Sequence, residues 1–214
     1  MTDTEKANVS TAELLARMIS VALVPPTWAA LGFAGLVAAY ESGSFQRKLL
    51  LWLIATGFNG LCQIVFVLYL KTRNRVTAYD IPKRRQRTGP YVFSVVLSLV
   101  GLLVLASLDA SAWVLGLTWC YAVNTGMLAV VNRFWKMSAH MMGMMGPLTA
   151  LFPTVGSWMF AALPIAILLG WSRLRLKAHT PAQVVAGGLA GILLTAAQLH
   201  LWFVYGQQWQ HIIR

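Results

Sequence analysis

Long apolar runs alternate with short polar segments along most of this chain. An α-helix needs about 20 mostly apolar residues to cross the roughly 30 Å hydrocarbon core of a bilayer. The pattern predicts seven such spans, or six if one helical hairpin stays shallow: residues 14–39, 49–70, 91–108, 112–132, 138–153, 155–171 and 180–205. We therefore predict an all-α, polytopic membrane helix bundle that forms a single domain over residues 1–214.

Turn and cap residues mark the start of the first helix and a break within it. Ser10 or Thr11 is suited to cap a helix, after a flexible tail over residues 1–9. Proline lacks an N–H and clashes with the preceding helical turn. Pro25 and Pro26 should therefore kink the first span, or divide an interfacial helix from the span proper.

Two other features of the pattern predict close packing of neighbouring helices. Only residues 109–111 separate the third and fourth spans, so these spans should form a tight helical hairpin. The last span carries Gly187, Gly188 and Gly191, together with Ala186 and Ala190. Small residues at this spacing are typical of a face that lets two membrane helices approach closely.

The composition fits a membrane protein and excludes several other classes. Hydrophobic residues make up 58% of the chain and charged residues 11%, whereas about a quarter of an average soluble domain is charged. Cys62 and Cys120 both lie inside apolar runs, which excludes a disulfide scaffold. The net charge of +11 suits nucleic acid, but apolar stretches of bilayer length do not, so we predict no nucleic-acid partner.

The basic residues are concentrated on one side of the predicted bundle. With seven spans, the N-terminus and the polar loops 71–90, 133–137 and 172–179 share that side. Of the 17 Lys and Arg residues, only Arg47, Lys48 and Arg214 fall on the other side. The positive-inside rule then places the basic side in the cytoplasm, with the protein in the cell membrane.

Three polar segments on the basic side each lead into a predicted span, and together they have the chemistry of an anion site. They cover residues 77–90, 135–140 and 172–183. The free N–H groups and the positive dipole end of a helix start both favour an anion. The segments add several guanidinium and ammonium groups and two of the four histidines. This combination predicts a site for a phosphate group.

The same segments resemble the signatures of the type 2 phosphatidic acid phosphatases. Residues 172–183 read S-R-x5-H-x3-Q, which is similar to the third signature, S-R-x5-H-x3-D. Residues 137–140 read M-S-A-H and resemble the second, P-S-G-H, while the basic segment before Pro90 takes the place of the first, K-x6-R-P. The resemblance covers roughly residues 77–200, the expected phosphatase-like core.

The chain departs from the family pattern in each signature. No arginine precedes Pro90, so Arg87 is the nearest substitute, and Arg84 and Arg85 compete with Lys83 for the role of the first cation. Methionine and alanine replace the proline and glycine of the second signature. A glutamine replaces the aspartate of the third; dolichyl diphosphate phosphatases resemble the chain in this respect, which moves the resemblance towards polyprenyl diphosphate substrates.

The resemblance implies a two-step hydrolysis of a lipid phosphate without a metal or other cofactor. His179 would attack phosphorus to give a phosphohistidine, and His140 would protonate the departing oxygen and then activate water. Gln183 would accept from His179 Nδ1–H and fix its tautomer. The residues expected to hold the phosphoryl oxygens are Arg173, Lys83, Arg87, Ser138 and Ala139.

Two functional hypotheses follow. The first is a phosphatase whose partners are membrane lipids and whose substrate is an isoprenoid (di)phosphate or a related phospholipid phosphate. The second is an inactive family member that acts as a lipid-binding or scaffolding membrane subunit, which the altered signatures favour. Asp80 has two possible roles, a salt bridge within the basic run or the positioning of an arginine.

Overall fold

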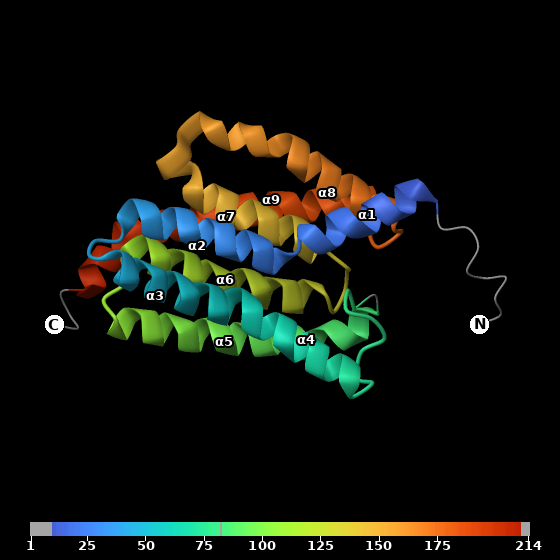
Figure 1. The fold of residues 1–214 in the computed structure, drawn as a ribbon, viewed down its shortest axis with the longest axis horizontal. Coiled ribbons are helices and arrows are strands. Elements are labelled where there is room, and N and C mark those ends of the chain that lie inside the picture. The colour runs from blue at the N-terminus through green and yellow to red at the C-terminus, as the bar shows by residue number, and fades with distance from the viewer. Residues whose placement is uncertain (1–9, 82, 211–214) are drawn as a thin grey trace.

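The computed structural model describes residues 10–81 and 83–210, so the tail predicted at residues 1–9 lies outside the described residues. The described residues form α-helices, short π- and 3₁₀-helical turns and connecting loops, and contain no strand. The predicted all-α class is therefore confirmed. The helices lie lengthwise against one another in a single bundle (Figure 1).

The first predicted span is broken where the two prolines stand. α1 (Thr11–Ala22) and α2 (Pro25–Tyr40) meet at an angle of 44°. Ser10 caps α1, because its Oγ accepts from the backbone N–H of Glu13 at 3.3 Å. α1 packs on α8 while α2 packs on α7, so the bend lets one apolar run cover two neighbours.

α3 and α4 form one long run that contains a π-helical turn. α3 (Phe45–Thr56) continues through η2 (Gly57–Leu61) into α4 (Cys62–Thr72), and the 28 residues together are long and apolar enough to cross a membrane. Asn59 in the turn is buried and donates to the Ala55 carbonyl at 2.9 Å. No residue of α4 is buried, so α4 stands at the edge of the bundle.

The predicted tight hairpin is present. A 3₁₀ turn, η3 (Arg84–Arg87), leads into α5 (Thr88–Ser107), and α6 (Ala112–Val131) returns alongside it. The buried carboxylate of Glu41, just after α2, accepts from the backbone N–H of Ser111 at 2.7 Å. This bond ties the end of α2 to the hairpin at the end of the bundle.

The chain folds back between α7 and α8. α7 (Ala139–Val155), the 3₁₀ segment η4 (Gly156–Ala162) and α8 (Leu163–Arg175) follow one another without a polar loop, yet α7 and α8 run in opposite directions (Figure 1). Gly156 provides the turn with φ = 55°, a conformation that favours glycine. α9 (Pro181–Gln210) then completes the bundle.

The predicted count of seven spans is not confirmed. By length and composition, five helices are suited to cross a membrane, or six if the bent pair α1 and α2 is one span. The fifth and sixth predicted spans fall within one apolar run, Ala139–Arg175. The α8 part has 13 residues and so measures about 20 Å, less than the hydrocarbon core.

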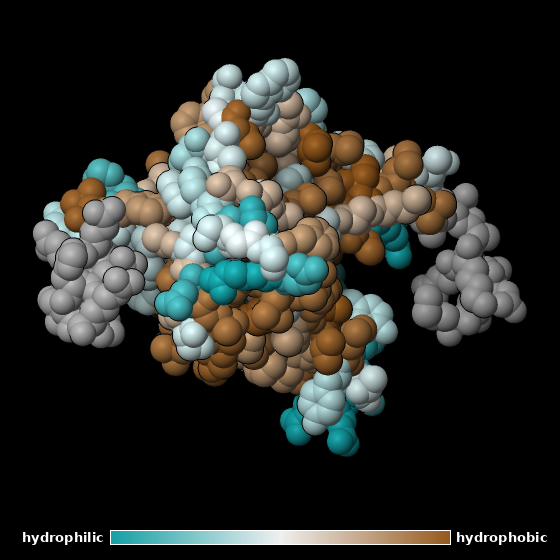
Figure 2. Space-filling view, turned by 60° about the vertical axis from the view of Figure 1, so that its left-hand side comes forward, coloured by the Kyte–Doolittle hydropathy of each residue, from teal (hydrophilic) through white to brown (hydrophobic). Residues whose placement is uncertain are grey.

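The outer surface of the bundle is largely apolar, which fits a lipid environment. Figure 2 shows wide hydrophobic areas on one face of the molecule. Large side chains on different helices are mostly exposed, among them Val65 at 64%, Leu103 at 71% and Ile167 at 72%. Continuous apolar surface of this kind is rare on soluble monomers and expected on a protein surrounded by lipid.

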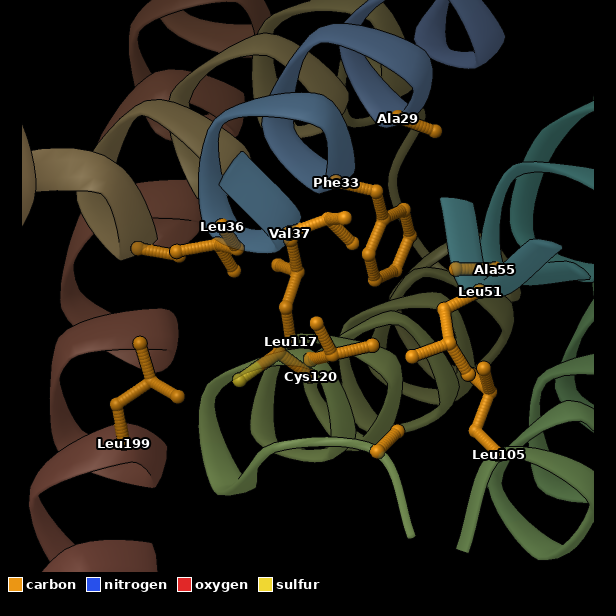
Figure 3. Close-up of a cluster of buried hydrophobic side chains, with 13 residues drawn as sticks. Ala29, Phe33, Leu36, Val37, Leu51, Ala55, Leu105, Leu117, Cys120 and Leu199 are labelled. Carbon is orange, nitrogen blue, oxygen red and sulfur yellow. The ribbon is translucent and has the colours of Figure 1, made fainter. Parts of the chain in front are cut away.

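The largest core cluster joins α2, α3, α5, α6, α7 and α9 (Figure 3). Phe33 of α2 is fully buried and stacks on Tyr121 of α6, with their ring centroids 5.7 Å apart. Leu51 of α3 and Leu105 of α5 are buried in the same cluster. Since apolar burial brings little gain in lipid, tight packing is what holds such helices together.

α9 approaches α7 to backbone contact, as the glycine pattern predicts. A Cβ placed on Gly187 would lie 2.4 Å from the carbonyl oxygen of Ser138, and one on Gly191 would lie 2.9 Å from that of Met142. Gly188, by contrast, has no atom closer than 3.8 Å to such a Cβ. The backbone N–H of Ser138 also donates to the Gln183 carbonyl at 3.1 Å, which fixes the register of the two helix starts.

We predict that Gly187→Ala destabilises the protein by about 1–3 kcal/mol, because the added methyl forces the two backbones apart. Gly188→Ala is the matched control and should be neutral or slightly stabilising, since alanine favours helix and finds space there. Thermal unfolding of both variants in detergent measures the difference. Equal midpoints for the two variants would contradict the close contact of α9 with α7.

Candidate active site

A cavity of about 580 Å³ enters the bundle at the end where α5, α7 and α9 begin. One end of it is polar and is lined by Asp80, Arg87, His140 and His179. The rest is mainly apolar; its lining includes Leu117 and Cys120 of α6 and Met142 of α7. The three polar segments singled out in the sequence thus contribute side chains to one end of one cavity.

His179 lies in the short turn between α8 and α9 and is only 7% exposed. Its Nδ1 is 3.2 Å from the backbone carbonyl oxygen of Lys136 and 3.2 Å from Oε1 of Gln183. A backbone carbonyl only accepts hydrogen bonds, so Nδ1 must carry the hydrogen. In the neutral ring Nε2 then keeps its lone pair, which is the form that a nucleophile requires.

Gln183 has two tasks in this turn. Its Oε1 accepts from the backbone N–H of Thr180 at 3.1 Å, and the Thr180 hydroxyl accepts from the backbone N–H of Gln183 at 3.4 Å. These reciprocal bonds form a capping box at the start of α9. The same oxygen faces His179, so the geometry agrees with the predicted role of Gln183 in fixing the tautomer.

His179 is neutral at physiological pH. Burial, together with the positive charges of Arg87, Arg173 and Lys136, lowers the pKa of His179 to about 4. Protonation would place a further positive charge in a poorly solvated cluster of cations, which is unfavourable. The imidazole is therefore available as a lone-pair donor across the neutral range.

Lys136 holds the His179 turn, a role that the sequence motifs do not reveal. Its carbonyl binds the imidazole, and its Nζ donates to the carbonyl of Ala178 at 2.8 Å. Burial lowers the pKa of the Lys136 ammonium, with Arg87 adding to the effect. Both contacts use the extended segment before α7, so this segment fixes the position of the histidine turn.

The start of α7 brings two of its three expected residues to the cavity. His140 and Ala139 lie in the first turn of the helix and line the polar end. Ser138 is fully buried and does not line the cavity. Its hydroxyl caps α7 by accepting from the backbone N–H of Met141 at 3.4 Å, so the sequence expectation of a phosphate contact from this hydroxyl finds no support.

Arg173 is fully buried and lies behind the cavity wall. Its Nη2 donates to Oδ2 of Asp80 at 2.6 Å, and its Nη1 donates to the hydroxyl of Ser20 in α1. Asp80 and Ser20 line the cavity, whereas Arg173 does not. Of the two roles left open for Asp80, the structure therefore shows the positioning of an arginine.

Asp80 carries its charge in this position. Burial alone would raise the pKa of the Asp80 carboxyl, but Arg173, His140 and Arg87 outweigh it and bring the pKa below its usual value. The carboxylate side chain keeps 44% of its surface exposed. An ionised carboxylate thus stands at the polar end of the cavity, between a buried guanidinium and the open space.

Arg87 reaches the cavity and Lys83 does not. The Arg87 side chain is 5% exposed, lines the polar end, and donates through Nε to the Ile81 carbonyl at 2.8 Å. Lys83 precedes the 3₁₀ turn that contains Arg87 and is exposed outside the cavity, as are Arg84 and Arg85. The substitute for the missing arginine is therefore at the site, while the three other cations of the run face outwards.

Comparison with known proteins provides no relative for this arrangement. No family model, no curated protein and no solved structure matches the chain. In the described part of the chain, no group of three or more His, Cys, Asp or Glu side chains is placed to hold a metal ion. The groups available for chemistry at the polar end are the imidazoles of His140 and His179, the Arg87 guanidinium and the Asp80 carboxylate. The Arg173 guanidinium lies behind Asp80.

The lowered pKa of His179 predicts a specific dependence of stability on pH. Between pH 6.5 and about 4 the unfolded chain binds a proton at this histidine and the folded protein does not, so stability falls as the pH falls through this window. His179→Asn removes the effect, while its amide can still donate to the Lys136 carbonyl. Unfolding midpoints of both proteins from pH 7.5 to 4 should therefore converge at the acidic end; a constant difference would contradict the shift.

Proposed function

We propose that this protein is a membrane-embedded phosphatase that hydrolyses a lipid phosphate, either an isoprenoid (di)phosphate or a related phospholipid phosphate. One observation carries the proposal. His179, with Nδ1 bound to a carbonyl and Nε2 free of hydrogen, lines the polar end of a cavity whose other walls are mainly apolar. A nucleophile beside the Arg87 guanidinium suits a phosphate, and the apolar walls suit the hydrocarbon chain attached to that phosphate.

The position of the cavity suits a substrate that enters from the bilayer. Val21 of α1 and Ile64 and Leu68 of α4 line the cavity, and all three are also substantially exposed on the lipid-facing surface. α1 and α4 thus border the space from two sides. A lipid can bring its chain in between them while its phosphate meets Arg87 and the two histidines.

The first chemical step transfers the phosphoryl group to the protein. Nε2 of His179 forms a bond to phosphorus as the bond from phosphorus to the leaving oxygen breaks. The negative charge of the bound phosphate favours the protonated form of His140, which donates this proton to the leaving oxygen. The oxygen departs as an alcohol, or as a lipid monophosphate when the substrate is a diphosphate. The Arg87 guanidinium and the free N–H groups at the start of α7 stabilise the charge on the phosphoryl oxygens.

The second step returns His179 to its starting form. His140, now neutral, accepts a proton from a water molecule, whose oxygen attacks the phosphohistidine. The bond between Nε2 and phosphorus breaks and inorganic phosphate leaves. Gln183 and the Lys136 carbonyl keep the ring in one tautomer throughout. The basic surface around the cavity mouth favours the cytoplasmic side of the cell membrane for this reaction.

The second candidate is a lipid-binding or scaffolding membrane subunit without turnover. The covered position of Arg173 favours it, because the guanidinium expected to bind phosphate is closed off from the cavity. The two candidates predict opposite outcomes in a phosphatase assay, since a scaffold releases no phosphate. A scaffold does not require an imidazole whose Nε2 lone pair is free beside a cavity, and for this reason we favour the enzyme.

We predict that His179→Asn lowers phosphate release at least about 1,000-fold, because the nucleophile is lost. The assay uses purified protein with farnesyl phosphate, farnesyl diphosphate and phosphatidic acid, in excess chelator. His200→Asn is the matched control, since His200 is exposed on α9 outside the cavity, and it should keep full activity. No release by folded wild-type protein across the panel, or equal rates in both variants, would contradict the phosphatase.

The proposed path of the lipid chain gives a separate prediction. Val67 of α4 lines the cavity, whereas Val65 on the same helix is 64% exposed on the outer face. Val67→Trp should raise KM for farnesyl phosphate by about tenfold, the scale of a few lost apolar contacts, and leave KM for a short soluble phosphoester unchanged. Val65→Trp should change neither. Parallel effects of the two substitutions would contradict the assignment of the chain path.

A further inference from the structure

Arg173 has an unused capacity to bind an anion. Its Nη2 donates to Asp80 and its Nη1 to Ser20, but its buried Nε has no partner in the part of the chain that the structure describes. Nε and Nη2 lie on one edge of the guanidinium, the edge that binds carboxylates and phosphates through two parallel bonds. Asp80 bonds to Nη2 alone, so Nε is left without a partner on this edge.

Asp80 occupies the position that a phosphate would take to reach this edge. Arg173 has no exposed surface and does not line the cavity. Asp80, in contrast, is partly exposed and lines the cavity. The Asp80 carboxylate also interacts electrostatically with Arg87 and His140, which line the same end of the cavity and would surround a bound phosphate. A ligand can therefore contact Arg173 only after the Asp80 side chain has moved aside.

The segment that carries Asp80 is held in a strained conformation. Ile81 has φ = 42°, a left-handed value that is unfavourable for a β-branched residue. Two bonds keep it there: its N–H donates to the Ala78 carbonyl at 3.0 Å, and its own carbonyl accepts from Arg87 Nε at 2.8 Å. Both bonds are independent of the contact between Asp80 and Arg173, so the Asp80 side chain can leave Arg173 while the backbone of the segment stays in place.

We propose that Asp80 makes the site selective for lipids with a terminal phosphate monoester or diphosphate over phosphodiester lipids. The inference rests on the proposed function and names how that site chooses its substrate. A terminal phosphate carries nearly two negative charges at neutral pH and can bind both Nε and Nη2, so it displaces the single carboxylate contact. A phosphodiester headgroup carries one charge, the same as Asp80, and gains little by exchange.

This selection answers a problem that any cationic site at a bilayer surface has. Phosphodiester lipids surround the protein in large excess, and a freely exposed Arg173 would bind them. Asp80 cancels the charge of Arg173 towards such lipids and towards the membrane in general. Asp80 is therefore a positioning residue: it acts on the ligand through Arg173, and its removal should change which lipids bind.

The test compares two lipids with identical acyl chains, dioleoyl phosphatidic acid and its methyl ester, dioleoyl phosphatidylmethanol. Binding is measured by titration calorimetry in a nonionic detergent at pH 7.5, in a His179→Asn background that prevents turnover. We expect the monoester to bind at least about tenfold more tightly, on the scale of one partly screened unit charge. Asp80→Asn should tighten binding of the methyl ester by about tenfold while monoester binding does not weaken.

Asp109→Asn is the charge-matched control, since Asp109 lies in the hairpin at the far end of the bundle, and it should leave both affinities unchanged. Asp80→Ala repeats the test without an acceptor for Arg173. An unchanged ratio in folded Asp80 variants would overturn the inference, and so would the loss of both ligands, which would mean that Asp80 only supports Arg173. Hydrolysis in wild-type protein tests the proposed function separately, so either can fail while the other is judged.

Discussion

The backbone contact between the starts of α7 and α9 is the constraint on which the site depends. Gly187 allows α9 to approach the carbonyl of Ser138, and the Ser138 N–H binds the Gln183 carbonyl. Because His140 follows Ser138 and His179 precedes the first turn of α9, this contact sets the two imidazoles at one end of one cavity. In lipid, where apolar burial gives little selectivity of packing, such a close approach is an effective way to fix a geometry.

From that contact the electrostatics of the site follow. The turn that carries His179 is anchored twice by Lys136 and is surrounded by Arg87 and Arg173, so the ring stays neutral and its hydrogen stays on Nδ1. The same cations create a strong field for an anion. Asp80 balances that field, and the balance explains how a buried guanidinium is tolerated beside a largely apolar cavity.

Local patterns in the sequence predicted the features that depend on neighbours along the chain. The break at Pro25, the cap at Ser10 and the pairing of His179 with Gln183 one helical turn away all belong to this kind. The π-turn at Gly57–Leu61 was not predicted. Phe58 within it packs closely against Gly101 of α5, a contact between segments that are distant along the chain.

Contacts between distant segments were also beyond the sequence. Asp80 and Arg173 are 93 positions apart, and only the folded bundle shows that the carboxylate covers the arginine. Lys83 and Ser138 were expected at the phosphate because of their place in the motifs. A 3₁₀ turn leaves Lys83 outside, and the capping of α7 occupies the Ser138 hydroxyl, details that depend on side-chain geometry rather than on spacing.

The proposed mechanism requires His179 to carry the phosphoryl group between the two steps. The most direct test mixes the wild-type protein with farnesyl phosphate whose phosphate oxygens carry a heavy isotope, stops the reaction with alkali after a few milliseconds, and locates the labelled phosphate by mass spectrometry. We expect an alkali-stable, acid-labile phosphate on His179. Full release of phosphate with no label on the protein, or a label on another residue, would contradict it.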